Sequence, residues 1–189
     1  MNTTDPKSIY RKLALIFFQT GNWSKAIVEY EKLITFDPND YNLHSILGDL
    51  FRKVGNFDRA YQEYEIAAKG FKAERNERKA SVVYRELTTL IRDHIEPQDS
   101  HRAIELYNQI LSEMPETVEA LENLRNLKYQ NGENQEALQL TIHLGNLYNK
   151  LDYIDKAKAE FLKALQMDPQ NEEANQKLTA LINEMEKLK

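Results

Sequence analysis

The chain has 189 residues, no cysteine and a net charge of −5. The lack of cysteine excludes disulfides, thiolate zinc sites and cysteine nucleophiles, and the acidic balance argues against a protein that binds nucleic-acid phosphates. No apolar stretch reaches the ~20 residues that cross a bilayer, and the start MNTTDPKSIY lacks the features of a secretory signal. We therefore expect a cytoplasmic protein without membrane insertion.

The composition favours helices, because Leu, Ala, Glu, Lys and Gln dominate while Gly and Pro number only 6 and 5. Asp5 and Pro6 suit an N-cap and the first helical position. Pro38, Pro115 and Pro169 are typical of helix ends. In chain order the pattern predicts ten helices and no sheet, over residues 6–19, 23–36, 41–53, 57–73, 76–95, 100–113, 118–130, 134–149, 153–167 and 172–187.

A set of small and aromatic residues recurs along the chain at a short period, an offset of 34 in residue number. The first two copies are Gly21, Ala26 and Tyr30, then Gly55, Ala60 and Tyr64. A third copy lies in LGNLYNKLDYIDKAKAEFLKALQMDP, at positions 144–169. We expect Gly21, Gly55 and Gly132 at left-handed turn positions.

This arrangement resembles the tetratricopeptide repeat family, whose repeat is a helix–turn–helix of about 34 residues. The resemblance implies a soluble bacterial protein with an all-α fold, a right-handed superhelical solenoid of five helix hairpins in a single domain over 1–189. The expected repeats are 7–40, 41–74, 75–116, 117–151 and 152–189. The amphipathic helix 172–187 is expected to cap the core. Its alternative role is a seam for homo-oligomer formation.

A second, long period carries Ala26, Ile27 and Tyr30 onto an equivalent set, Ala103, Ile104 and Tyr107, at an offset of 77 in residue number. It indicates duplication of a four-helix unit. Inside each unit a similar turn recurs at an offset of only 20, as in GNFDRA at 55–60 and RNERKA at 75–80. Helices 57–73 and 134–149 therefore carry the features of both a second and a first helix of a repeat.

The sequence offers no chemistry for catalysis. No glycine-rich phosphate loop and no nucleophile arrangement is visible. His94 and His101 flank the segment IEPQDS, where a helix end and solvated charges explain the composition better than a metal site. We expect no enzyme activity, no cofactor and no metal.

First helices of a solenoid line its concave side, and the side chains one and four residues after the small residue, and three before it, face that groove. The predicted groove residues are Arg11, Phe18, Asp49, Arg52, Arg85, Arg92, Asn123, Asn126 and Tyr129. Arginines suit carboxylates and side-chain amides suit a peptide backbone, so we expect an acidic or extended segment of another protein. Leu15 and Ile46 stand where the family's chaperone-tail clamp has asparagines, which argues against that ligand.

The resulting prediction is a non-enzymatic scaffold or adaptor for protein–protein interaction. The alternatives are a secretion-type chaperone for an exported substrate and a self-assembling subunit of a larger complex. Two questions stay open at this point. Asn146 and Asn149 join the groove only if helix 134–149 acts as a first helix, and the convex face is an alternative binding surface.

Overall fold

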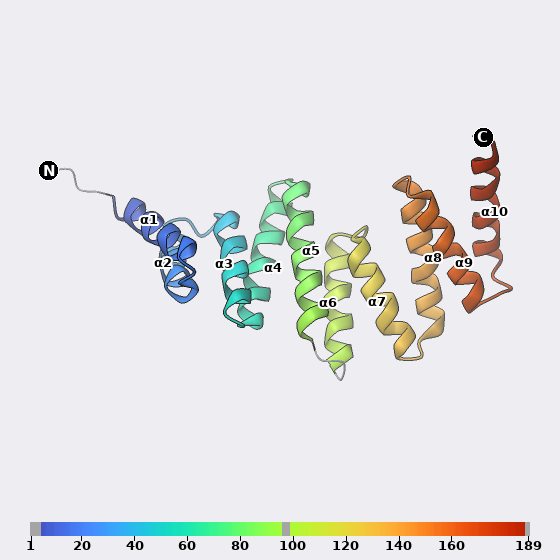
Figure 1. The fold of residues 1–189 in the computed structure, drawn as a ribbon, viewed down its shortest axis with the longest axis horizontal. Helices are drawn as coiled ribbons and strands as arrows, with labels where there is room; N and C mark the ends of the chain where they lie inside the picture. The colour runs from blue at the N-terminus through green and yellow to red at the C-terminus, as the bar shows by residue number, and fades with distance from the viewer. Residues whose placement is uncertain (1–4, 96–98, 188–189) are drawn as a thin grey trace. The chain divides into compact units, whose positions relative to one another are not determined.

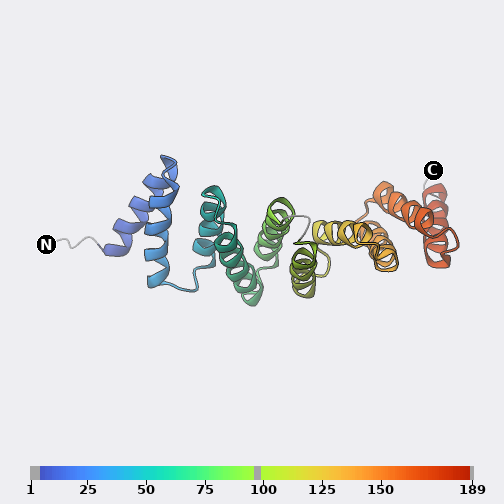
Figure 2. The same cartoon turned by 90° about the horizontal axis from the view of Figure 1, so that it is seen from below.

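The computed structural model describes residues 5–95 and 99–187 and contains two compact units, 1–94 and 95–189. Each unit is described here by itself, and the single continuous domain stays a prediction. Every helix packs against its neighbours in the chain within its unit (Figures 1 and 2). Across the described residues, all regular structure is helical, as predicted.

Ten helices form the described part of the chain, and the predicted bounds are confirmed to within one residue. Unit 1 contains α1 (Pro6–Gln19), α2 (Trp23–Phe36), α3 (Tyr41–Lys53), α4 (Phe57–Ala73) and α5 (Glu77–His94). Unit 2 contains α6 (Ser100–Glu113), α7 (Val118–Gln130), α8 (Asn134–Lys150), α9 (Ile154–Met167) and α10 (Glu172–Lys187). The one-residue differences fall at α5, α8 and α9, where helix ends fray.

Five tight turns of one geometry follow α1, α3, α4, α7 and α8. In each turn an amide donates to the carbonyl five residues earlier, the Schellman arrangement that ends helices. The five pairs are Asn22 to Phe17, Asn56 to Phe51, Asn76 to Phe71, Glu133 to Lys128 and Tyr153 to Tyr148, at 2.8–2.9 Å. The residue before each donor has positive φ, which confirms the prediction for Gly21, Gly55 and Gly132. Arg75 and Asp152 adopt the same conformation without being glycine, with φ of 58° and 61°.

At each tight turn a charged side chain contacts the residue whose carbonyl accepts the turn's hydrogen bond, and it comes from eight residues further along the chain. In four turns a cation lies over the aromatic ring that starts the turn: Lys25 over Phe17, Arg59 over Phe51, Lys79 over Phe71 and Lys156 over Tyr148, at 4.8–5.5 Å. In the fifth turn Lys128 instead pairs with Glu136, at 2.9 Å. Since α4 and α8 each have such a turn at both ends, their predicted double role has a structural basis.

The long period is visible in the helix bounds. Helices α2 to α5 begin at 23, 41, 57 and 77, and α6 to α9 begin at 100, 118, 134 and 154. Each helix of the second series begins 77 residues after its counterpart in the first series. The two four-helix series therefore share one frame and can be compared residue by residue.

The two units pack differently at the contact between the second and third helices of each series, which are α3 and α4 in unit 1 and α7 and α8 in unit 2. In unit 1 Gly48 lies against Tyr64, since a Cβ atom on Gly48 would lie 2.5 Å from Cδ1 of the ring. Their long-period counterparts are Arg125 and Thr141, and both are buried. The large side chain has thus moved from the third helix of the series to the second, which conserves volume.

A buried polar pair also distinguishes the two units. His44 Nδ1 lies 2.7 Å from Glu63 Oε2, and His44 Nε2 lies 3.0 Å from the carbonyl oxygen of Pro38. The long-period counterparts of His44 and Glu63 are Leu121 and Leu140. Leu121 is buried and Leu140 packs against the core of unit 2, so an apolar pair suits the same frame.

We predict that Gly48→Leu lowers the free energy of unfolding by about 1–3 kcal/mol, because the new side chain must displace the Tyr64 ring. The same substitution in a Tyr64→Thr background should lower it less, since the threonine leaves the space that Arg125 uses in unit 2. Urea unfolding of the four proteins measures the difference. Equal losses in both backgrounds would contradict the packing.

We also predict that Glu63→Leu alone lowers stability by about 1–3 kcal/mol, because it leaves the buried His44 ring without its carboxylate partner. The double variant His44→Leu with Glu63→Leu should recover most of that loss, since an apolar pair replaces the polar one. Thermal unfolding of both variants provides the test. A double variant less stable than Glu63→Leu would show that unit 1 depends on the pair.

Candidate functional site

The candidate site lies in unit 2, where α7 and α9 meet on one side of α8. Arg125 Nη1 on α7 lies 2.5 Å from Glu160 Oε2 on α9. Both residues are buried, at 7% and 9% exposure. This ion pair joins two helices that are separated in the chain by the whole of α8.

An open hollow of about 730 Å³ adjoins this ion pair. Its lining comes from α7, α8, α9 and the loop after α9: Arg125, Asn126, Tyr129, Asn134, Gln135, Leu138, Lys163, Gln166, Met167, Asp168 and Pro169. Four of these residues carry side-chain amides, each of which can donate and accept hydrogen bonds. The lining therefore combines amides with apolar groups and cations.

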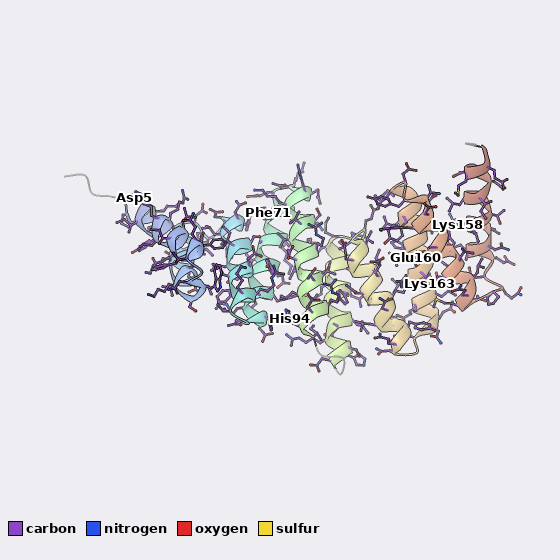
Figure 3. All side chains as sticks on the ribbon, viewed as in Figure 1. Asp5, Phe71, His94, Lys158, Glu160 and Lys163 are labelled. Atoms are coloured by element: carbon purple, nitrogen blue, oxygen red, sulfur yellow. The ribbon has the colours of Figure 1, made fainter. Side chains whose placement is uncertain are left out.

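Two cations of the hollow share one buried carboxylate. Besides its bond to Arg125, Glu160 has an oxygen, Oε1, at 3.7 Å from Lys163 Nζ. Figure 3 labels Glu160 and Lys163 on α9. Asp168, the acid in the lining, accepts hydrogen bonds from the backbone amide of Gln170 at 3.1 Å and from Asn171 Nδ2 at 3.4 Å. Asp168 thus binds the loop after α9 and keeps its negative charge, so two cations and two carboxylates, Glu160 and Asp168, balance at the hollow.

The equivalent region of unit 1 is occupied by the protein's own ion pairs. Arg52 Nη1 lies 3.4 Å from Glu86 Oε2, and its Nη2 lies 3.8 Å from Asp49 Oδ1. Asp49 also accepts the hydroxyl of Tyr64 at 2.5 Å. Burial, and then this hydrogen bond, raise the pKa of Tyr64, so the hydroxyl stays neutral.

The predicted groove residues are partly brought together. Arg52 and Asp49 lie in the ion-paired network of unit 1, and Asn126 and Tyr129 line the hollow of unit 2. Arg92 Nε donates to Asp93 Oδ1 at 2.8 Å, and this hydrogen bond lowers the pKa of Asp93.

The remaining predicted residues lie apart from the hollow. Arg11 and Arg85 are exposed on α1 and α5, Asn123 is half-buried on α7, and Phe18 packs edge-on against Trp23 at 5.6 Å. That any of the predicted groove residues binds a partner stays a prediction.

Sequence reasoning did not single out Arg125, Lys163, Gln166 or Met167, which line the hollow. One signal was available. The long period aligns Glu86 with Lys163, which reverses the charge at one position of the frame.

A second hollow of about 410 Å³ lies on α8, with lining from α7, α8 and α10. Asn146 lines it, together with His143 and Glu173, while Asn149 is exposed. The turn after α8 has the geometry of the turn after a first helix, which supports the alternative that includes Asn146. Whether a partner uses this side stays open.

Other features of the described residues bear on chemistry. His94, which Figure 3 labels, stacks on Phe57 with ring centroids 3.5 Å apart. Among residues 5–95 and 99–187, no three His, Cys, Asp or Glu side chains gather closely enough to hold a metal ion. Residues 96–98 of the segment between His94 and His101 lie outside this description. None of the described helices has the length and apolar character to span a membrane.

Comparison with known proteins gives matches of two kinds. A relative from Haemophilus influenzae, an uncharacterized protein, is 36% identical over 56 residues, which are 30% of this chain and 31% of the relative. The chain thus matches less than a third of that relative's length. A crystal structure of MamA protein aligns with a TM-score of 0.53 at 18% identity, over 96% of this chain and 92% of that one. A MamA RS-1 double mutant aligns with a TM-score of 0.50 at 13% identity, over 89% and 97%. These structures support the fold.

Two family models match the chain itself. A TPR repeat model covers residues 14–55, and a tetratricopeptide repeat model covers residues 138–171. The second match spans most of α8 and all of α9, which makes α8 its first helix. With the helical repeat fold and its recurring tight turns, these matches show that the chain contains repeats of the tetratricopeptide repeat family.

Proposed function

We propose that this protein is a non-enzymatic scaffold or adaptor that binds a segment of another protein in the hollow between α7 and α9. Its repeats of the tetratricopeptide repeat family support a role in protein–protein interaction. The observation that carries the proposal is the hollow of about 730 Å³, with its amide-rich lining and its exposed tyrosine.

The lining suits an extended segment. Such a segment presents a backbone donor and a backbone acceptor at most residues, and the amides of Asn126, Asn134 and Gln135 can pair with both. Tyr129 is 59% exposed beside them. Tyrosine is enriched among residues that dominate binding energy, because it offers a large apolar surface with a polar end.

The two alternative functions have less support. A chaperone for an exported substrate needs an apolar groove, whereas most side chains of this hollow are polar or charged. Homo-oligomer formation through α10 needs an apolar outer face on that helix. Ala174, Leu178 and Leu181 are instead buried in the core of unit 2, which favours an adaptor over self-assembly.

We predict that a photo-crosslinking amino acid in place of Tyr129 captures a partner protein in the native cell. The matched control is the same replacement at Tyr153, which is also exposed in unit 2, at 55%, but does not line the hollow. Tyr129→Ala should weaken binding of the captured partner at least tenfold, about 1.4 kcal/mol. Capture at position 153 alone would contradict the proposal.

The predicted groove residues of unit 1 remain a second proposed surface. Arg52→Glu with Arg92→Glu should weaken partner binding at least tenfold if these arginines contact the partner. Since both already pair with nearby carboxylates, loss of an internal ion pair must be separated from loss of binding. Circular dichroism and thermal unfolding of the double variant provide that control, and normal binding at low salt would exclude this surface.

A further inference from the structure

We infer that the hollow between α7 and α9 selects a segment with one carboxylate side chain beside an apolar residue. This inference rests on the proposed function and specifies the chemistry of the bound segment.

The cations retain capacity to bind an anion. Arg125 donates through Nη1 to Glu160 and through Nε to Asn126 Oδ1, at 2.5 and 3.2 Å. Its Nη2 has no hydrogen-bond partner among the residues that the structure describes. Lys163 Nζ lies 3.7 Å from Glu160, and the side chain is 47% exposed. Glu160 contacts both cations, whereas Asp168 bonds to the loop after α9, so a ligand carboxylate can still bind the remaining donors of Arg125 and Lys163.

At the equivalent positions of unit 1, carboxylates of the protein itself pair with a cation. There, Glu86 and Asp49 face Arg52. Their long-period counterparts are Lys163 and Asn126, and Tyr129 stands in place of Arg52. The acids of unit 1 are thus absent from these positions of unit 2, which leaves the positions open to a carboxylate of the ligand.

The rest of the lining indicates which kind of residue stands next to the acid in the bound segment. Leu138 is buried and Met167 is half-buried at the hollow, and Tyr129 adds an exposed ring. An apolar side chain next to the acid would cover these groups. The segment 96–189 carries a net charge of −7, which repels a run of acids within a Debye length of about 8 Å. A single acid therefore fits better than an acidic tract.

The test uses the full chain and three fluorescein-labelled hexapeptide pools. The first two pools are acetylated and amidated, with Glu-Leu or Gln-Leu at the centre and mixed residues around it. The third has Gln-Leu and a free terminal carboxylate. By fluorescence anisotropy, the Glu-Leu pool should bind at least tenfold more tightly than the amidated Gln-Leu pool. This advantage should shrink as salt rises and disappear in Lys163→Gln.

A double variant that places an internal ion pair at the hollow provides the most specific test. Tyr129→Arg with Lys163→Glu rebuilds in unit 2 the ion pair of Arg52 and Glu86, at equivalent positions of the same frame. It should keep the unfolding temperature and lose binding of the Glu-Leu pool. Lys177→Glu, on the exposed surface of α10, makes the same lysine-to-glutamate change outside the hollow and should leave binding unchanged.

Each other outcome overturns the inference. Equal binding of the amidated Glu-Leu and Gln-Leu pools, or binding of the free-carboxylate pool alone, would show that no acidic side chain is selected. Absence of binding by all three pools would overturn it as well. In these cases, capture of a partner through position 129 keeps the proposed function, so its failure and that of the acidic-segment inference are distinguishable.

Discussion

The tight turn between successive helices is the constraint on which the rest of the structure depends. Its geometry recurs after α3 and α4 and again after α7 and α8. Two such turns in succession return the chain to the same side of the middle helix. That is why Arg52 on α3 meets Glu86 on α5, and why Arg125 on α7 meets Glu160 on α9. The candidate site follows from this return of the chain.

At equivalent positions of the two four-helix series, the two units fill the same space between helices with different side chains. Unit 1 fills the space beside Gly48 with a buried tyrosine ring, whereas unit 2 fills it with Arg125 and sets Glu160 against the charge. Removing two charges from water requires a desolvation free energy that their attraction seldom exceeds. The buried pair of unit 2 is therefore poorly explained by stability. It places a guanidinium at the wall of a hollow, which an apolar pair would not do.

Local sequence patterns predicted most of the fold, and long-range pairing limited the prediction of the site. Helix bounds and turn glycines depend on neighbours within a few residues, as at Gly55 and Pro38. The state of Arg52 depends instead on Glu86, two helices further along the chain, and that of Arg125 depends in the same way on Glu160. Helix geometry placed Asn126 and Tyr129 on the face of α7 that lines the hollow, but it could not tell neutralised arginines from available ones.

The difference between the units bears on the proposed selection of an acidic segment by unit 2. Unit 1 satisfies its cations with its own carboxylates, so a ligand there must compete with an internal ion pair. In unit 2 the counterparts of those acids are an amide and a lysine, and the cations keep donors facing a hollow. Asn126 and Lys163 replace the two acids of unit 1, while Tyr129 and Arg125 replace Arg52 and Gly48 beside them. The two acids are half-buried in unit 1 and their counterparts are exposed in unit 2, so the charge at these positions can change outside the core that the tight turns hold in register.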